Sequence, residues 1–180
     1  MTREFIVSDH TLCTGCGICE LACSGFKEKS YNTSKSRIRV VSIGYTLNMA
    51  IACRLCEDPA CVRACPRHAL TQDEETGIID VDEDKCNGCG WCIYACRDGL
   101  IFIDPHKNTC FTCDLCKDAP DGKQRCVEAC PHEALTKMTA DALATRLRTR
   151  EITRLLEEEV IIPTPPLEKK DERAHSFKKY

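Results

Sequence analysis

The sequence lacks any apolar run long enough to cross a membrane, and its first residues contain no apolar stretch typical of a signal peptide. Aromatic residues make up only 6% of the chain. The formal net charge of -3 gives no basic footprint for nucleic acid. We therefore expect a cytoplasmic protein with no membrane span and no nucleic-acid partner.

Apolar side chains other than cysteine are also scarce. The hydrophobic fraction of 43% includes 17 cysteines, and without them roughly a third of the 180 residues is apolar, against about 45–50% in ordinary domains. Packing alone is thin support for a fold of this size. Disulfides in an oxidising compartment, or metal in a reducing one, must supply the rest.

Sixteen of the cysteines fall into four groups separated by cysteine-free connectors. The groups are Cys13, Cys16, Cys19 and Cys23; Cys53, Cys56, Cys61 and Cys65; Cys86, Cys89, Cys92 and Cys96; and Cys113, Cys116, Cys126 and Cys130.

These groups form an internal duplication. The third group falls on the first at an offset of 73, and Gly88 and Gly90 then match Gly15 and Gly17. The fourth falls on the second at an offset of 60, which becomes 65 after five extra residues. The chain is therefore a repeat of two unlike motifs.

The spacing of the first and third groups, C-x2-C-x2-C-x3-C, resembles that of two-cluster ferredoxins, in which it binds 4Fe-4S clusters. Zinc and disulfides remain alternatives. Three cysteines within seven residues argue against zinc, because structural zinc sites join two short knuckles across a longer loop. A radical-SAM enzyme would need C-x3-C-x2-C, which the sequence does not contain.

In two-cluster ferredoxins the fourth cysteine of each run binds the other cluster. The resemblance implies crossed ligation between the second and third groups, and between the first and fourth. The implied iron ligands are Cys53, Cys56, Cys61 with Cys96; Cys86, Cys89, Cys92 with Cys65; Cys13, Cys16, Cys19 with Cys130; and Cys113, Cys116, Cys126 with Cys23. Pairing of sequential groups remains open.

Residues 8–136 resemble the four-cluster ferredoxin-like subunits of molybdenum or tungsten pterin oxidoreductases. They are similar to the β subunits of the dimethyl sulfoxide reductase family, and to the iron-sulfur subunits of carbon monoxide dehydrogenase and of aldehyde:ferredoxin oxidoreductase-type enzymes. The resemblance rests on the group order and on runs such as Cys-Thr-Gly-Cys-Gly-Ile-Cys at 13–19. It implies four 4Fe-4S clusters, electron relay and a larger catalytic redox subunit, and it is compatible with a further electron donor or acceptor protein.

The expected fold is α+β, with two linked ferredoxin-like modules followed by a C-terminal helix and an extended tail. We expect one module from residues 1–52 with 105–137, a second from 53–104, and a segment for partner docking from 138–180. Short strands are predicted at 37–43, 76–81 and 100–103, and a polar loop at 24–36. One long helix is predicted over 139–160 with Thr139 at its start, followed by an extended stretch at 161–167.

Two features outside the ligand pattern have plain interpretations. Cys110 is interpreted as a buried small hydrophobe rather than a ligand, and Lys27, Lys29 and Lys35 as cations of a solvated loop rather than a docking site. No nucleophile with its base and no G-x-G-x-x-G fingerprint is present, so the chain itself is expected to be non-catalytic. A free polyferredoxin, a zinc-stapled interaction module and a subunit that completes a partner's active site remain alternatives.

Overall fold

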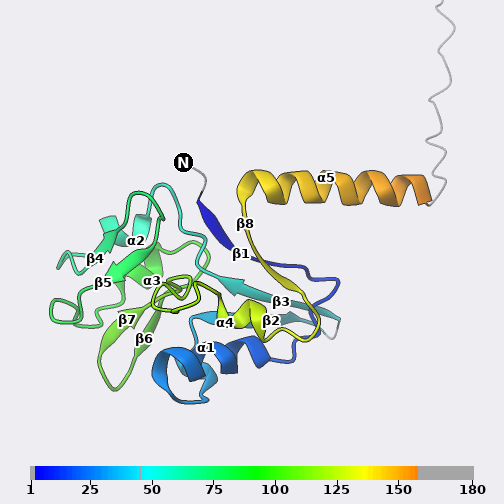
Figure 1. Cartoon of the computed structure of the whole chain (residues 1–180). Helices are drawn as coiled ribbons and strands as arrows, with labels where there is room; N and C mark the ends of the chain where they lie inside the picture. Colours follow the sequence, from blue (N-terminus) through cyan, green and yellow to red (C-terminus); the bar gives the residue numbers. More distant parts are fainter. Residues whose placement is uncertain (1–2, 45, 158–180) are drawn as a thin grey trace, which may run out of the picture. The chain divides into compact units, whose positions relative to one another are not determined.

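The computed structural model describes residues 3–44 and 46–157. It divides into a compact unit of residues 1–144 and a second unit of residues 145–180. In the described residues the strands of the first unit pair into four two-stranded antiparallel sheets (Figure 1). The pairs are β1 (Glu4–Ser8) with β8 (Leu135–Thr139), β2 (Ile38–Ile43) with β3 (Leu47–Ala52), β4 (Leu70–Gln72) with β5 (Ile79–Val81), and β6 (Phe102–Asp104) with β7 (Thr109–Phe111).

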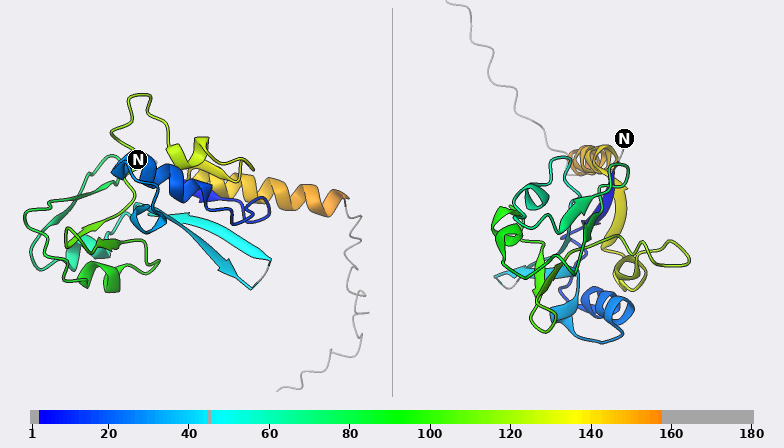
Figure 2. Two further views of the ribbon diagram at one scale, coloured as in Figure 1. Left: turned by 90° about the horizontal axis from the view of Figure 1, so that it is seen from below. Right: turned by 90° about the vertical axis from the view of Figure 1, so that its left-hand side faces the viewer.

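Two of these sheets join segments on either side of different cysteine groups. Strand β1 lies beside β8, with Ile6 opposite Lys137, so the residues before the first group meet those after the fourth (Figure 1). Strand β4 follows the second group and pairs with β5, which precedes the third. The other two sheets are hairpins, and Figure 2 shows the β2–β3 hairpin projecting from the body of the unit.

Short helices carry the ends of the cysteine groups. They are α1 (Ile18–Glu28), α2 (Ala60–Arg63), α3 (Trp91–Ala95) and α4 (Arg125–Glu128), with a 3-10 turn at Thr33–Lys35. Helices α1 and α3 both begin after a glycine with positive φ, Gly17 at 73° and Gly90 at 82°, a conformation that an L side chain disfavours. The two motifs that match in sequence therefore also share the backbone conformation at the start of their helices.

The prediction of a polar loop over 24–36 was wrong for its first part, because α1 continues to Glu28 and a 3-10 turn follows. Lys27 on this helix is not solvated either, since its side chain is only 5% exposed. The strands predicted at 37–43, 76–81 and 100–103 are confirmed with shifted ends as β2, β5 and β6.

The core consists of two clusters of buried side chains. One joins Ile6, Ile38 and Leu135 to four cysteines of the first and fourth groups. The other joins Leu70, Ile79 and Ile101 to Cys65, Cys92 and Cys110. Strand β7 belongs to the second cluster through Cys110, although the sequence-based boundary at residue 105 would assign it to the other module. The module division itself stays a prediction.

The long helix predicted near the C-terminus is α5 (Ala140–Glu157), and its start is capped as expected by Thr139, whose hydroxyl accepts the N–H of Ala142 at 3.2 Å. The predicted extended stretch at 161–167 and the charged tail lie outside the described residues. Within residues 3–44 and 46–157, no helix is both long and apolar enough to span a bilayer.

Candidate metal centres

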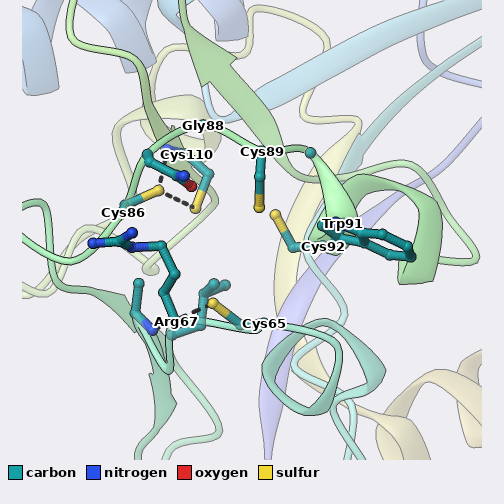
Figure 3. A pocket seen from close by; sticks show the side chains of 12 residues that line it. Cys65, Arg67, Cys86, Gly88, Cys89, Trp91, Cys92 and Cys110 are labelled. Carbon is teal, nitrogen blue, oxygen red and sulfur yellow. Dashed lines mark hydrogen bonds between the residues drawn. The ribbon is translucent and has the colours of Figure 1, made fainter.

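The structure gathers the sixteen grouped cysteines into four sets, each with three members from one group and one from another. Three sets line separate pockets: a first set of Cys13, Cys16, Cys19 and Cys130; a second of Cys53, Cys56, Cys61 and Cys96; and a third of Cys65, Cys86, Cys89 and Cys92. Figure 3 shows the third set around its pocket. These are the groupings that crossed ligation requires; the binding of iron by these sulfurs stays a prediction.

The fourth set contains Cys23, Cys113, Cys116 and Cys126, all of which are buried. Burial, together with the charge of nearby Cys23, raises the pKa of Cys113 to about 12. Burial and then Cys23 likewise contribute to the raised pKa of Cys116. Cys23 therefore lies among the sulfurs of the fourth group, although it belongs to the first.

Backbone N–H groups point at several of these sulfurs. The N–H of Ala69 donates to Cys65 Sγ and that of Leu100 to Cys96 Sγ, both at 3.3 Å and both four residues after the cysteine. The N–H of Arg37 donates to Cys23 Sγ at 3.3 Å. Hydrogen bonds of this kind stabilise anionic sulfur, so the donors suit thiolates bound to a metal.

Burial disfavours free thiolates at these positions. It raises the pKa of Cys19 to about 12 and that of Cys61 to about 11, with neighbouring acidic or sulfur groups adding to each shift. At neutral pH such thiols stay protonated unless a cation replaces the proton. Four cysteine sulfurs that line one pocket and accept hydrogen bonds from backbone N–H groups are a ligand set that fits an iron-sulfur cluster.

All seventeen cysteines lie in the described part of the sequence and none forms a disulfide. Among residues 3–44 and 46–157, no three His, Cys, Asp or Glu side chains lie close enough together to hold a single metal ion. The sulfurs of the first three sets are spread around the pockets that they line, as a multi-atom cluster requires.

Comparison with known proteins identifies the family. A family model described as a 4Fe-4S dicluster domain matches residues 45–140, and a second, described as a 4Fe-4S binding domain, matches residues 10–31. The protein belongs to the 4Fe-4S dicluster family. Residues 45–140 of this dicluster protein contain the second, third and fourth cysteine groups, and residues 10–31 contain the first.

Relatives of this dicluster protein are oxidoreductase subunits. It is 42% identical over 132 residues to the aliphatic sulfonate oxidoreductase, polyferredoxin-like subunit, of Pyrococcus furiosus, with 73% of each protein covered. It is 37% identical over 151 residues to the B subunit of the anaerobic dimethyl sulfoxide reductase of Escherichia coli, and the match covers 75% of this protein and 73% of that subunit. One chain of the solved active-site complex BamBC of benzoyl coenzyme A reductase aligns over 87% of this protein and 99% of its own length, at 22% identity and a TM-score of 0.46.

The predicted resemblance to iron-sulfur subunits is confirmed, and so is the predicted function of electron transfer as a subunit of an oxidoreductase complex. The predicted 4Fe-4S chemistry is confirmed at the level of the family. The number of clusters, their ligands and the metal of the catalytic partner are proposals.

A buried ion-pair network covers the fourth set. Lys27 Nζ lies 2.6 Å from Asp114 Oδ2 and 3.0 Å from Asp118 Oδ2, and Arg37 Nη1 lies 2.8 Å from the same oxygen of Asp114. Burial alone would lower the pKa of Lys27, but its hydrogen bonds to Asp114 and then Asp118 raise it above the ordinary value. Asp114 follows Cys113 directly and also accepts the N–H of Cys116 at 3.1 Å, so the network fixes the loop that carries two sulfurs.

Cys110 is buried, as the sequence predicted, and it also lines the pocket of the third set as a fifth cysteine. Thr112 was not recognised from the sequence. It lines the pocket of the second set, and its hydroxyl donates to the carbonyl of Leu100 at 2.8 Å. The signal that could have revealed it is its place directly before Cys113 of the fourth set.

We predict that Asp114→Ala destabilises the protein by about 3 kcal/mol, because it leaves the buried Lys27 and the partly buried Arg37 without their shared carboxylate. Asp118→Ala is the matched control. It removes the second carboxylate of Lys27, but the Asp118 side chain is 69% exposed, so only a small loss is expected. Anaerobic denaturant unfolding followed by circular dichroism measures both, and equal losses would contradict a special role for Asp114.

Proposed function

We propose that the protein holds four 4Fe-4S clusters, one in each cysteine set. It relays single electrons to or from a larger catalytic subunit that carries a tungsten or molybdenum pterin. The observation that supports it is the gathering of sixteen cysteines into four sets of four. Each cluster would supply one-electron redox chemistry when bound. The protein's own part is to hold the sulfurs, donate hydrogen bonds to them and shield them from water.

The contacts between sets support a relay in which neighbouring clusters exchange electrons. Cys110 lies at the third set, Thr112 at the second, and Cys113 in the fourth, so four consecutive residues contact three sets. Cys53, a member of the second set, packs against the buried core cluster that contains Cys113 of the fourth. We infer that the second and fourth sets are neighbours.

The remaining step leads from the fourth set to the first. Burial raises the pKa of Cys126, and among the charges that add to this shift is that of Cys19 in the first set. The inferred order is third, second, fourth, first. A row of this kind has two ends at which a catalytic centre and a second redox protein can exchange electrons with the clusters.

The partner is proposed from the relatives. An aliphatic sulfonate oxidoreductase and an anaerobic dimethyl sulfoxide reductase each include the subunit that this protein resembles. A docking role for α5 agrees with three large apolar side chains of this helix that are exposed, Leu147 at 47%, Ile152 at 58% and Leu156 at 76%. Each such side chain, if fully buried against a partner, would contribute roughly 1.5–3 kcal/mol to the free energy of association.

Anaerobically purified protein is expected to contain about sixteen iron and about sixteen acid-labile sulfide per molecule, four of each for every cluster. Inductively coupled plasma mass spectrometry and a sulfide assay measure the two. Stoichiometric zinc with negligible sulfide would refute the proposal in favour of a zinc-stapled interaction module. About twelve iron would reduce the proposal to three clusters.

Cys65→Ser is expected to alter the cluster of the third set, although Cys65 belongs to the second cysteine group. Cys96→Ser is the reciprocal variant and is expected to alter the cluster of the second set. Electron paramagnetic resonance of the reduced proteins distinguishes the two, because Cys56→Ser and Cys89→Ser provide the reference spectra for a disturbed second and third set. The Cys65→Ser spectrum should match the change in Cys89→Ser; a match to Cys56→Ser would refute crossed ligation.

Truncation after Ala144, where the first compact unit ends, is expected to weaken assembly with the catalytic subunit while iron content is unchanged. The full-length variant with Leu147, Ile152 and Leu156 replaced by serine is expected to weaken it too, since the exposed apolar side chains are the proposed contact. Co-purification from native cells measures assembly. A protein that purifies as a monomer whether or not it is truncated would support a free polyferredoxin instead.

A further inference from the structure

The duplication aligns two hairpins that border equivalent sets. At the offset of 60, Asn48 in the β2–β3 hairpin corresponds to Asn108 at the β6–β7 turn. Each asparagine lies against a glycine of a cysteine loop. A Cβ on Gly15 would come 2.7 Å from Asn48 Oδ1, and a Cβ on Gly88 would come 2.4 Å from Asn108 Oδ1. The first and third sets therefore have the same hairpin against the same loop.

Within this common frame, the buried residue 50 differs from its counterpart 110 in side chain and in the acceptor of its backbone N–H, which is Ser8 Oγ at 3.3 Å for Ala50. Ala50 lines the pocket of the first set, and its counterpart at the offset of 60 is Cys110, which lines the pocket of the third. Both residues are buried, at 3% and 4% exposure. The third set thus has a fifth sulfur where the first has a methyl group.

Cys110 directs two hydrogen-bonding groups at one ligand sulfur. Its backbone N–H donates to Cys86 Sγ at 3.4 Å, and the Sγ atoms of the two cysteines lie 3.7 Å apart (Figure 3). Cys92 lines the same pocket. When Cys86 binds iron as a thiolate it carries no proton, so the proton between the two sulfurs must belong to Cys110, which becomes the donor.

A donor to a ligand sulfur changes the potential of the cluster. The reduced cluster carries one more negative charge than the oxidised cluster, and a hydrogen bond stabilises the more negative state more strongly. The effect is large in a buried site, where water does not screen the interaction. Ala50 presents only a methyl group, which cannot donate.

We propose that Cys110 is a positioning residue of the third set whose S–H group donates to the sulfur of Cys86 and raises the reduction potential of that cluster above the value it would have with alanine at this position. The proposal rests on the proposed function, because it requires a 4Fe-4S cluster in the third set. It adds that the difference between residues 50 and 110 separates the potentials of two clusters held in duplicated frames.

The test compares Cys110→Ala with the wild-type protein in a redox titration monitored by electron paramagnetic resonance. We expect four clusters in both proteins, one potential that is lower in the variant, and three that are unchanged. Cys110→Ser keeps a donor at the same position and is expected to restore most of the shift. The reciprocal variant Ala50→Cys is expected to raise one potential, that of the first set.

Ile103→Val is the matched control for packing. Ile103 lies directly opposite Cys110 in the β6–β7 pair and packs on the same core cluster, but it has no group that donates to sulfur. Its four potentials should equal those of the wild type. An equal shift in Ile103→Val and Cys110→Ala would overturn the proposal, because loose packing would then explain both.

The remaining outcomes separate this proposal from the proposed function. A wild-type protein without iron-sulfur clusters would refute the proposed function. Four intact clusters with unchanged potentials in Cys110→Ala would overturn only the role of Cys110. Loss of one cluster in Cys110→Ala would also overturn it, because Cys110 would then act as a ligand. If Cys110→Ala does not fold, Cys110→Ser and Ala50→Cys still test the proposal. An Ala50→Cys variant in which the potential of the first set is unchanged would contradict the proposed effect.

Discussion

One backbone hydrogen bond, made twice, holds together the segments that carry the first and third cysteine sets. The N–H of Asp82 donates to the carbonyl of Ala69 at 2.8 Å, and the N–H of Asp9 donates to the carbonyl of Ala134 at 2.7 Å. Each bond extends a short antiparallel pair and brings the segment that leaves a fourth cysteine beside the segment that enters a first cysteine. Together with the β4–β5 and β1–β8 pairs, the contact brings Cys65 to the pocket of Cys86 and Cys130 to the pocket of Cys13. The mixed composition of the first and third sets therefore agrees with strand pairing.

A core organised in this way depends on what the sulfurs bind. Four of the nine buried residues in one core cluster are cysteines, and three of the seven in the other. Their burial raises the pKa of several thiols, as for Cys113, so deprotonation without metal is costly. The aliphatic side chains that remain, such as Ile38 and Leu70, are few. Cluster binding and folding are thus coupled by the same residues, which explains how so little apolar surface suffices.

The composition of the cysteine sets was expected from the resemblance to two-cluster ferredoxins, in which the fourth cysteine of each run binds the other cluster; the ligation of iron by these sets stays a prediction. The strands β2, β5 and β6 followed from local patterns. What failed depended on distant partners. The polar residues before Lys29 favoured a loop, yet α1 continues because Lys27 reaches Asp114, which lies 87 positions away. The β1–β8 pair joins the two ends of the first unit, and no local pattern distinguishes such strands from extended loops.

The duplication also shows where the protein departs from symmetry. At the offset of 60, Arg54 after the first cysteine of the second group corresponds to Asp114 after the first cysteine of the fourth. Arg54 pairs with Asp98 at 3.1 Å, whereas Asp114 pairs with Lys27 and Arg37, so the polarity of the ion pair is reversed. Charges beside a cluster shift its potential because they interact differently with its two oxidation states. Two copies of one frame would hold clusters of equal potential and give electrons no preferred direction. Duplication alone would leave the reduction potentials of the proposed clusters equal. The reversed ion pairs beside the second and fourth sets would make these two potentials differ, and such a difference gives electrons a preferred direction.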